Sequence, residues 1–267
     1  MKLTARLAAC ALALAGAATA HAHNVWLMPS STVLSKAEWI TVDAAVSNDL
    51  FFFNHVPLRL DGLVVTGPDG AEVKPENLHT GKLRSVFDLN LTKPGTYRLA
   101  VINGGLFANY KDKATGQPKR WRGTAENFAK EVPADAQELR VTQSAGRVET
   151  FVTVGKPTPI KPSAQGLELI PVTQPADLVK GEKATFAFHI DGKPAADLEV
   201  VLVHGGTRYR DSVGEIKTKT DAKGEFTVTW PTAGMYWIDA DAKDDKTSLP
   251  QAKERRLSYV GTVEVLP

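Results

Sequence analysis

The octapeptide Pro94-Gly95-Thr96-Tyr97-Arg98-Leu99-Ala100-Val101 decides the fold of this 267-residue chain. Its Pro-Gly pair is a turn signal, and the residues after it alternate so that Tyr97, Leu99 and Val101 share one face. This alternation is typical of a half-buried β-strand. Similar short patterns recur at residues 39–42, 63–66, 86–89 and 148–154. The sequence therefore predicts an all-β fold.

A proline-rich segment divides the chain into two parts. Pro157, Pro159 and Pro162 exclude a central strand, because proline cannot donate to a β-ladder, and we expect a stiff linker at 157–166. Short strands spaced by turns favour β-sandwiches. We therefore predict two immunoglobulin-like β-sandwich domains, at 23–156 and 167–267. The strands predicted for the second domain are 184–190, 198–203, 226–230, 235–240 and 258–265.

Residues 104–136 form an insertion that is rich in basic side chains. Within it, residues 124–130 predict a short helix with Thr124 as its N-cap. Long insertions in compact domains are often functional. Two interpretations stay open: a solvated loop that Trp121 anchors on the core, or a binding element built on Trp121 and the basic residues around it.

Residues 1–22 are predicted to be a secretory signal peptide. Lys2 and Arg6 supply its positive start, and residues 7–18 are an almost unbroken run of Ala, Leu and Gly that is too short to span a bilayer stably. Small residues permit cleavage after Ala20 or after Ala22, of which we favour the second. The protein is therefore expected to be exported to the periplasm, with no transmembrane segment.

The composition excludes several classes of function. Lys and Arg number 32 and Asp and Glu number 30, which leaves no basic footprint for nucleic acid. The one cysteine, Cys10, lies in the signal peptide, so the mature chain has no thiol chemistry. The sequence has no Gly-x-Ser-x-Gly elbow and no phosphate-binding glycine loop. Asp239 and Asp241 share one face of a predicted strand, where a solvent-facing pair is the simpler interpretation.

The new N-terminus carries the most specific chemical signal. Cleavage after Ala22 makes His23 the first residue, whose α-amino nitrogen and Nδ1 together chelate one metal ion. A third nitrogen from a distant histidine would complete a T-shaped site for Cu(II), with square-planar Ni(II) as an alternative. Cleavage after Ala20 would instead make His23 the third residue, where it binds the same metals together with the amine and two backbone amides.

His55 is the predicted third ligand, with Asp49 and His204 as lesser candidates. Two interpretations stay open for Phe51-Phe52-Phe53, which precedes His55. These aromatic residues either wall off a site whose polar members are Asp49, Asn54 and His55, or they belong to the core. His204 ends a predicted strand, where it either points into a cleft or caps an edge. From His23 onward, no His-x-His or Cys-x-x-Cys pair indicates a zinc site.

Two segments resemble a bacterial family whose domain has no assigned function: His23-Asn24-Val25-Trp26-Leu27, and residues 220–226 followed by Ala233-Gly234-Met235-Tyr236. The resemblance implies a periplasmic protein of β-sandwich modules, associated with nickel and cobalt uptake and, in some members, with TonB-dependent metal receptors. The second segment also resembles transthyretin-like modules. Some members carry a histidine where this chain has Asp239 and Asp241, which weakens the case for a metal site there.

These observations predict an exported, non-enzymatic protein that binds or hands on nickel, cobalt or copper, with a membrane transporter or TonB-dependent receptor as its partner. One alternative is an adhesion or carbohydrate-type binding module that uses Trp121 and the basic insertion. Another is a copper oxidoreductase built on the N-terminal histidine.

Overall fold

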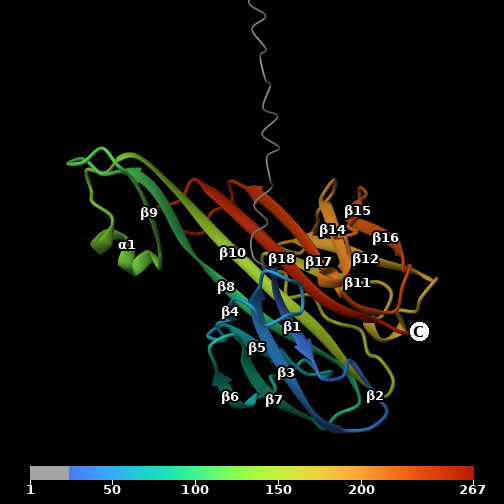
Figure 1. Ribbon diagram of the computed structural model, residues 1–267. Helices are drawn as coiled ribbons and strands as arrows, with labels where there is room; N and C mark the ends of the chain where they lie inside the picture. Colours follow the sequence, from blue (N-terminus) through green and yellow to red (C-terminus); the bar gives the residue numbers. More distant parts are fainter. Residues whose placement is uncertain (1–23) are drawn as a thin grey trace, which may run out of the picture.

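The computed structural model describes residues 24–267 (Figure 1). The predictions for the signal peptide and for His23 therefore lie outside the described residues. Strands dominate the described chain, which confirms the all-β prediction. Each strand predicted from the sequence overlaps an observed one.

Two outer sheets enclose a larger central sheet. The first outer sheet has the order β1-β3-β7-β6 with β4 beside β3, and the second has the order β11-β12-β13 with β16 beside β12. Their strands are β1 (Asn24–Pro29), β3 (Glu38–Ser47), β4 (Val56–Pro57), β6 (Glu76–Thr80), β7 (Ser85–Leu91), β11 (Leu167–Pro171), β12 (Lys183–Ile190), β13 (Lys193–Pro194) and β16 (Glu225–Thr229).

The central sheet has nine strands in the order β15-β14-β17-β18-β10-β8-β5, with β2 beside β10 and β9 beside β8. A short 3-10 turn at Thr207–Tyr209 lies between β14 and β15, and another at Pro175–Asp177 lies between β11 and β12 of the second outer sheet. The nine strands are β2 (Val33–Leu34), β5 (Leu63–Thr66), β8 (Gly95–Lys111), β9 (Pro118–Gly123), β10 (Gln137–Val154), β14 (Glu199–His204), β15 (Ile216–Lys219), β17 (Gly234–Asp244) and β18 (Glu254–Val265).

The outer sheets cover opposite faces of the central sheet. On β10, Val148 and Val152 belong to the core beneath the first outer sheet, whereas Phe151 belongs to the core beneath the second. Neighbouring residues of a strand point to opposite faces. Each outer sheet therefore forms a β-sandwich with one face of the same central sheet.

Strands β10 and β18 join the two sandwiches. They pair in parallel, from Thr142 opposite Glu254 to Thr150 opposite Thr262. The central sheet therefore continues through both sandwiches without a break. The sequence predicts two sandwiches and a linker but not this shared sheet, and its domain boundaries stay predictions.

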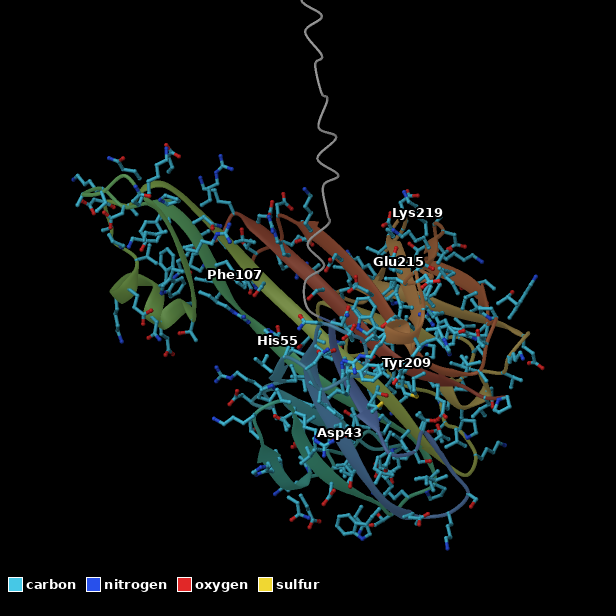
Figure 2. All side chains as sticks on the ribbon, in the orientation of Figure 1. Asp43, His55, Phe107, Tyr209, Glu215 and Lys219 are labelled. Carbon is cyan, nitrogen blue, oxygen red and sulfur yellow. The ribbon has the colours of Figure 1, made fainter. Side chains whose placement is uncertain are left out.

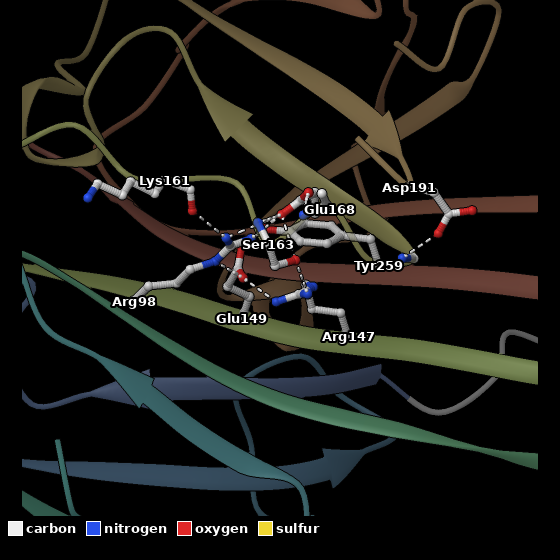
Figure 3. A network of polar contacts seen from close by, with 10 residues as sticks. Arg98, Arg147, Glu149, Lys161, Ser163, Glu168, Asp191 and Tyr259 are labelled. Atoms are coloured by element: carbon white, nitrogen blue, oxygen red, sulfur yellow. Dashed lines mark hydrogen bonds and ion pairs between the residues drawn. The ribbon is translucent and has the colours of Figure 1, made fainter. Parts of the chain in front are cut away.

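A buried ionic network fixes the proline-rich segment to the central sheet (Figure 3). Arg98 of β8 donates to the carboxylates of Glu149 and Glu168 and to the carbonyl oxygen of Lys161. Glu168 also accepts hydrogen bonds from the backbone and hydroxyl of Ser163. Burial alone would raise the pKa of Glu168, but these hydrogen bonds and the charge of Arg98 hold it below its usual value. The segment is thereby tied to both sandwiches.

The insertion forms a β-ribbon that projects from the sandwiches and carries the helix α1 (Ala125–Glu131) (Figure 1). Strand β8 runs on through the start of the insertion to Lys111 and pairs with β9. The side chain of Thr124 accepts a hydrogen bond from the backbone of Asn127, which confirms the predicted helix and its N-cap.

Trp121 anchors this helix to the ribbon. Its ring packs edge-on against Phe128 with 5.5 Å between the ring centroids, and its Nε1 donates to Glu131 over 2.6 Å. The insertion is thus a paired ribbon instead of a loop, and Trp121 contacts the helix instead of a sandwich core. A binding role for the insertion stays a prediction.

Candidate functional site

A cleft of about 700 Å³ lies where the first described residue of the chain meets the central sheet. On β17, Tyr236, Ile238 and Ala240 are buried in the second core. The alternate residues Trp237 and Asp239 consequently point to the other face, where they line the cleft. Beyond the edge of the first outer sheet, this face of the central sheet is not covered by another sheet.

The start of β1 is held at this cleft by contacts from both sandwiches. The indole Nε1 of Trp237 donates to the carbonyl oxygen of Val25 over 2.9 Å. Asn24 pairs with Ser47 in the sheet register, and its Nδ2 donates to the carbonyl oxygen of Asn48 over 3.3 Å. Asn24 and Val25 therefore line the cleft at a fixed position.

Two carboxylates on β17 have raised pKa values. Burial, together with the charge of Asp241, raises the pKa of Asp239 to about 7. The carboxylate of Asp239 accepts no hydrogen bond within residues 24–267, although the cations Arg210 and Lys217 line the same cleft. Partial burial also raises the pKa of Asp241, and the charge of Arg256 offsets part of this effect. The other acidic residues that line the cleft are Asp49, Asp211 and Glu215.

One end of the cleft is closed by two loops, one from each sandwich. Asp49 accepts hydrogen bonds from Asn54 over 2.7 Å and from Arg208 over 3.1 Å. The guanidinium of Arg208 also lies 4.1 Å from the ring centroid of Phe52, and Tyr209 meets the same ring edge-on. Asp49 therefore links the two loops, and one of its carboxylate oxygens already accepts a hydrogen bond from Arg208.

Phe51 and Phe53 are partly buried and pack against a small core cluster. Their ring centroids lie 5.6 Å and 5.3 Å from that of Trp26, in a small cluster that also includes Leu50. Phe51 and Phe53 therefore fit the interpretation that the aromatic residues belong to the core. Phe52 instead packs against Arg208 and Tyr209. His55 is half-buried at the end of the same loop (Figure 2).

His204 lies outside the lining of the cleft, with partners on both ring nitrogens. Its Nε2 is 3.0 Å from the carbonyl oxygen of Ala233, which makes Nε2 the protonated nitrogen. Its Nδ1 accepts a hydrogen bond from Arg210 over 3.1 Å. Arg210 also donates to the carbonyl oxygens of Gly205 and Val213. His204 therefore holds the loop after β14 in place.

The described residues alone do not form a metal centre. Within residues 24–267, no three His, Cys, Asp or Glu side chains are close enough together to hold one ion. The cleft brings Asp49 near Asn24, the neighbour of His23, but His204 and His55 do not line it. The sequence placed Asp239 and Asp241 on one face but did not predict that Asp239 is half-buried, since its cover comes from distant segments.

The fold and the cleft define an all-β protein of two sandwiches with a polar cleft at their junction. The chain belongs to the family described as domain of unknown function DUF4198, whose model matches residues 20–244. This confirms the resemblance to a family without an assigned function, and the association with metal uptake stays a prediction. A comparison with curated proteins finds no match. Among the described residues, no helix has the length and apolar character needed to cross a membrane.

Several solved structures share a coarse likeness with the chain. The D0-D1 domain of intimin is 12% identical, with 91% of this chain and 99% of that one covered and a TM-score of 0.22. A segment of two fibronectin type III domains from chicken tenascin is 11% identical, with 91% and 99% covered and a TM-score of 0.23. A DUF4785 family protein from Legionella pneumophila is 9% identical, with 80% and 50% covered and a TM-score of 0.24.

Proposed function

We propose that this protein is exported to the periplasm and binds a transition metal ion, nickel, cobalt or copper, as cargo in the cleft at the start of β1. The observation that supports this proposal is the position of Asn24 on the cleft wall that also carries Asp239. His23 precedes Asn24 by one peptide unit, so its Cα is about 3.8 Å from that of Asn24.

The donor set suits the proposed metals. After cleavage at Ala22, His23 supplies an α-amino nitrogen and an imidazole nitrogen, which nickel, cobalt and copper ions favour. Asp239 supplies a carboxylate that has no hydrogen-bond partner within residues 24–267, and a bound cation would stabilise its ionised form. His55 is the third nitrogen ligand predicted from the sequence, but it does not line the cleft, so Asp239 takes the third position in the site proposed here. Asp49 and His204 are weaker ligand candidates, because each is already hydrogen-bonded to an arginine.

The signal peptide predicted from the sequence and the family resemblance support export to the periplasm as part of this proposal. A periplasmic protein that holds a metal ion at a cleft between rigid sandwiches is suited to passing it to a membrane transporter or a TonB-dependent receptor. We propose no catalytic step, and the copper oxidoreductase alternative would require turnover of a reductant with oxygen or peroxide.

The test is a calorimetric titration of the exported, processed protein with Ni(II), Co(II) and Cu(II). We expect Asp239→Asn to weaken binding of the preferred metal at least tenfold. Asp245→Asn, an exposed carboxylate in the loop after β17, is the matched control and should bind as the wild type does. If no metal binds, or if Asp239→Asn and Asp245→Asn behave alike, the cleft is not the metal site.

A further inference from the structure

A second and larger cavity lies on the same face of the central sheet, beside the cleft. It is a groove of about 1030 Å³ between the ribbon and the strands β17 and β18. Gly146 of β10 is one of the lining residues. A larger residue at this position would force neighbouring side chains to move, because a Cβ atom there would lie 2.7 Å from the side chain of Asn103 and 3.0 Å from that of Ser258. A lone ion would leave most of this volume empty, and its size is typical of a small-molecule site.

The groove carries an excess of positive charge. Arg120 and Arg122 project from β9, Lys243 from β17 and Arg256 from β18, against the carboxylate of Asp241. Of the four cations, Arg256 is paired with Glu254, and the other three form no ion pair within the residues that the structure describes. The groove therefore attracts an anion with several charges.

The remaining lining narrows the chemistry of that anion. Three of the four cations are arginines, whose planar guanidinium groups match carboxylates with two parallel hydrogen bonds. Asn103, Asn109 and Ser144 add neutral polar groups to the wall. Phe107, on the ribbon in Figure 2, has Arg122 above its ring at 5.1 Å and so is partly covered. Trp121 also lines the groove, but its ring packs against Phe128 and its Nε1 is hydrogen-bonded to Glu131. The lining therefore favours a compact polycarboxylate over a sugar that needs an open aromatic platform.

The groove and the cleft are neighbours. Asp241 and Ser258 line both of them, so the positive groove continues directly into the acidic cleft. A ligand that spans this boundary would place negatively charged carboxylates in the groove and a positive charge in the cleft. A metal ion chelated by a polycarboxylate has negative carboxylates on one side and the positive metal ion on the other.

We propose that the groove binds a polycarboxylate anion, and that the metal reaches the cleft as its chelate with that anion. The metal half of this inference rests on the proposed function, whereas the anion half does not. Citrate is a suitable probe, because it is a small polycarboxylate that chelates nickel.

The experiment measures binding of citrate, Ni(II) and Ni(II)-citrate to the processed protein by calorimetry. The groove variant is Arg120→Gln with Arg122→Gln and Arg256→Gln, all exposed residues whose change should leave the fold intact. The control is Arg59→Gln with Lys36→Gln and Lys82→Gln, three exposed cations of the first sandwich. We expect citrate affinity to fall at least tenfold in the groove variant and to stay unchanged in the control.

The three ligands separate the two proposals. Ni(II)-citrate should bind the wild type at least tenfold more tightly than citrate alone, and this gain should disappear when the α-amine of His23 is blocked. Failure of Ni(II) alone to bind would exclude nickel as the proposed cargo without changing the citrate result. Equal citrate affinity in the groove variant and the control, or Ni(II)-citrate binding no better than citrate, would overturn the inference.

Discussion

The indole nitrogen of Trp237 and the carbonyl oxygen of Val25 form a 2.9 Å hydrogen bond between residues 212 positions apart. This bond fixes the first strand of one sandwich to a central strand of the other. It thereby determines which part of the molecule the residue before Asn24 can reach. The account of the cleft depends on this relationship.

Removal of this bond should loosen the N-terminus without unfolding the protein. Trp237→Phe keeps an aromatic ring but removes the donor, and we expect the free energy of unfolding to fall by about 1 kcal/mol. Metal affinity should fall several-fold if the proposal is right, because Asn24 and Val25, which follow the proposed ligand His23, would no longer be fixed at the cleft. Trp39→Phe is the control, since Trp39 is half exposed on β3, away from the cleft. Urea denaturation and metal titration are the two measurements, and equal behaviour of both variants would contradict the role given to Trp237.

Asp239 should give the metal-free protein a distinctive pH dependence. Its pKa is raised to about 7 in the folded state, whereas an unfolded aspartate titrates near its usual value of 3.8. Between these values the folded state binds a proton that the unfolded state has lost, so this residue reduces stability as the pH rises from about 4 to 7. The loss persists above pH 7.

Asp239→Asn should remove this contribution. Because other carboxylates titrate in the same range, the quantity to measure is the difference in unfolding free energy between variant and wild type at several pH values with a chelator present. We expect the variant to gain about 2 kcal/mol relative to the wild type between pH 4 and pH 8, a figure reduced for the partial exposure of the side chain. A difference that does not change with pH would show that Asp239 is an ordinary surface carboxylate.

The buried network at the junction should be far more sensitive to a lost charge than to a lost hydrogen bond. Glu149 is fully buried between Arg98 and Arg147, and the hydroxyl of Tyr259 donates to it over 3.0 Å. Glu149→Gln leaves Arg147 without its buried carboxylate and Arg98 with Glu168 alone, and should cost about 3 kcal/mol or more of unfolding free energy. Tyr259→Phe removes one neutral donor and should cost about 1 kcal/mol. Urea denaturation of both variants measures the contrast, and similar losses would mean that the charges are not what holds the junction together.

Local sequence signals predicted the strands well, because alternation and turn chemistry act over a few residues. Leu99 and its neighbours alternate as half-buried strand residues do, and Thr124 offers the side-chain acceptor that a helix start needs. The parallel pairing of Thr142 with Glu254 has no local signature, since it joins segments more than a hundred residues apart. For this reason the sequence predicts two separate sandwiches, whereas the structure shows that both share the central sheet.

The candidate site was only partly predictable for the same reason. The sequence placed Asp239 and Asp241 on one face of a strand, but their environment comes from β1 and from loops of the other sandwich. The partners of Asp49 and His204, Arg208 and Arg210, lie in a loop that carries no motif. Two of the predicted ligands are consequently held by arginines, a contact that residue type alone could not indicate.

The most direct test of the account compares metal binding by two forms of the protein that differ only before His23. One form is exported and processed, with its N-terminal residue verified by mass spectrometry, and the other retains a methionine in front of His23. The extra residue converts the α-amine into an amide, so we predict that Ni(II) or Cu(II) affinity falls at least tenfold, which is about 1.4 kcal/mol, while the unfolding midpoint of the metal-free protein stays unchanged. Equally tight binding by the extended form would contradict the account, because the amine of His23 would then not be a ligand.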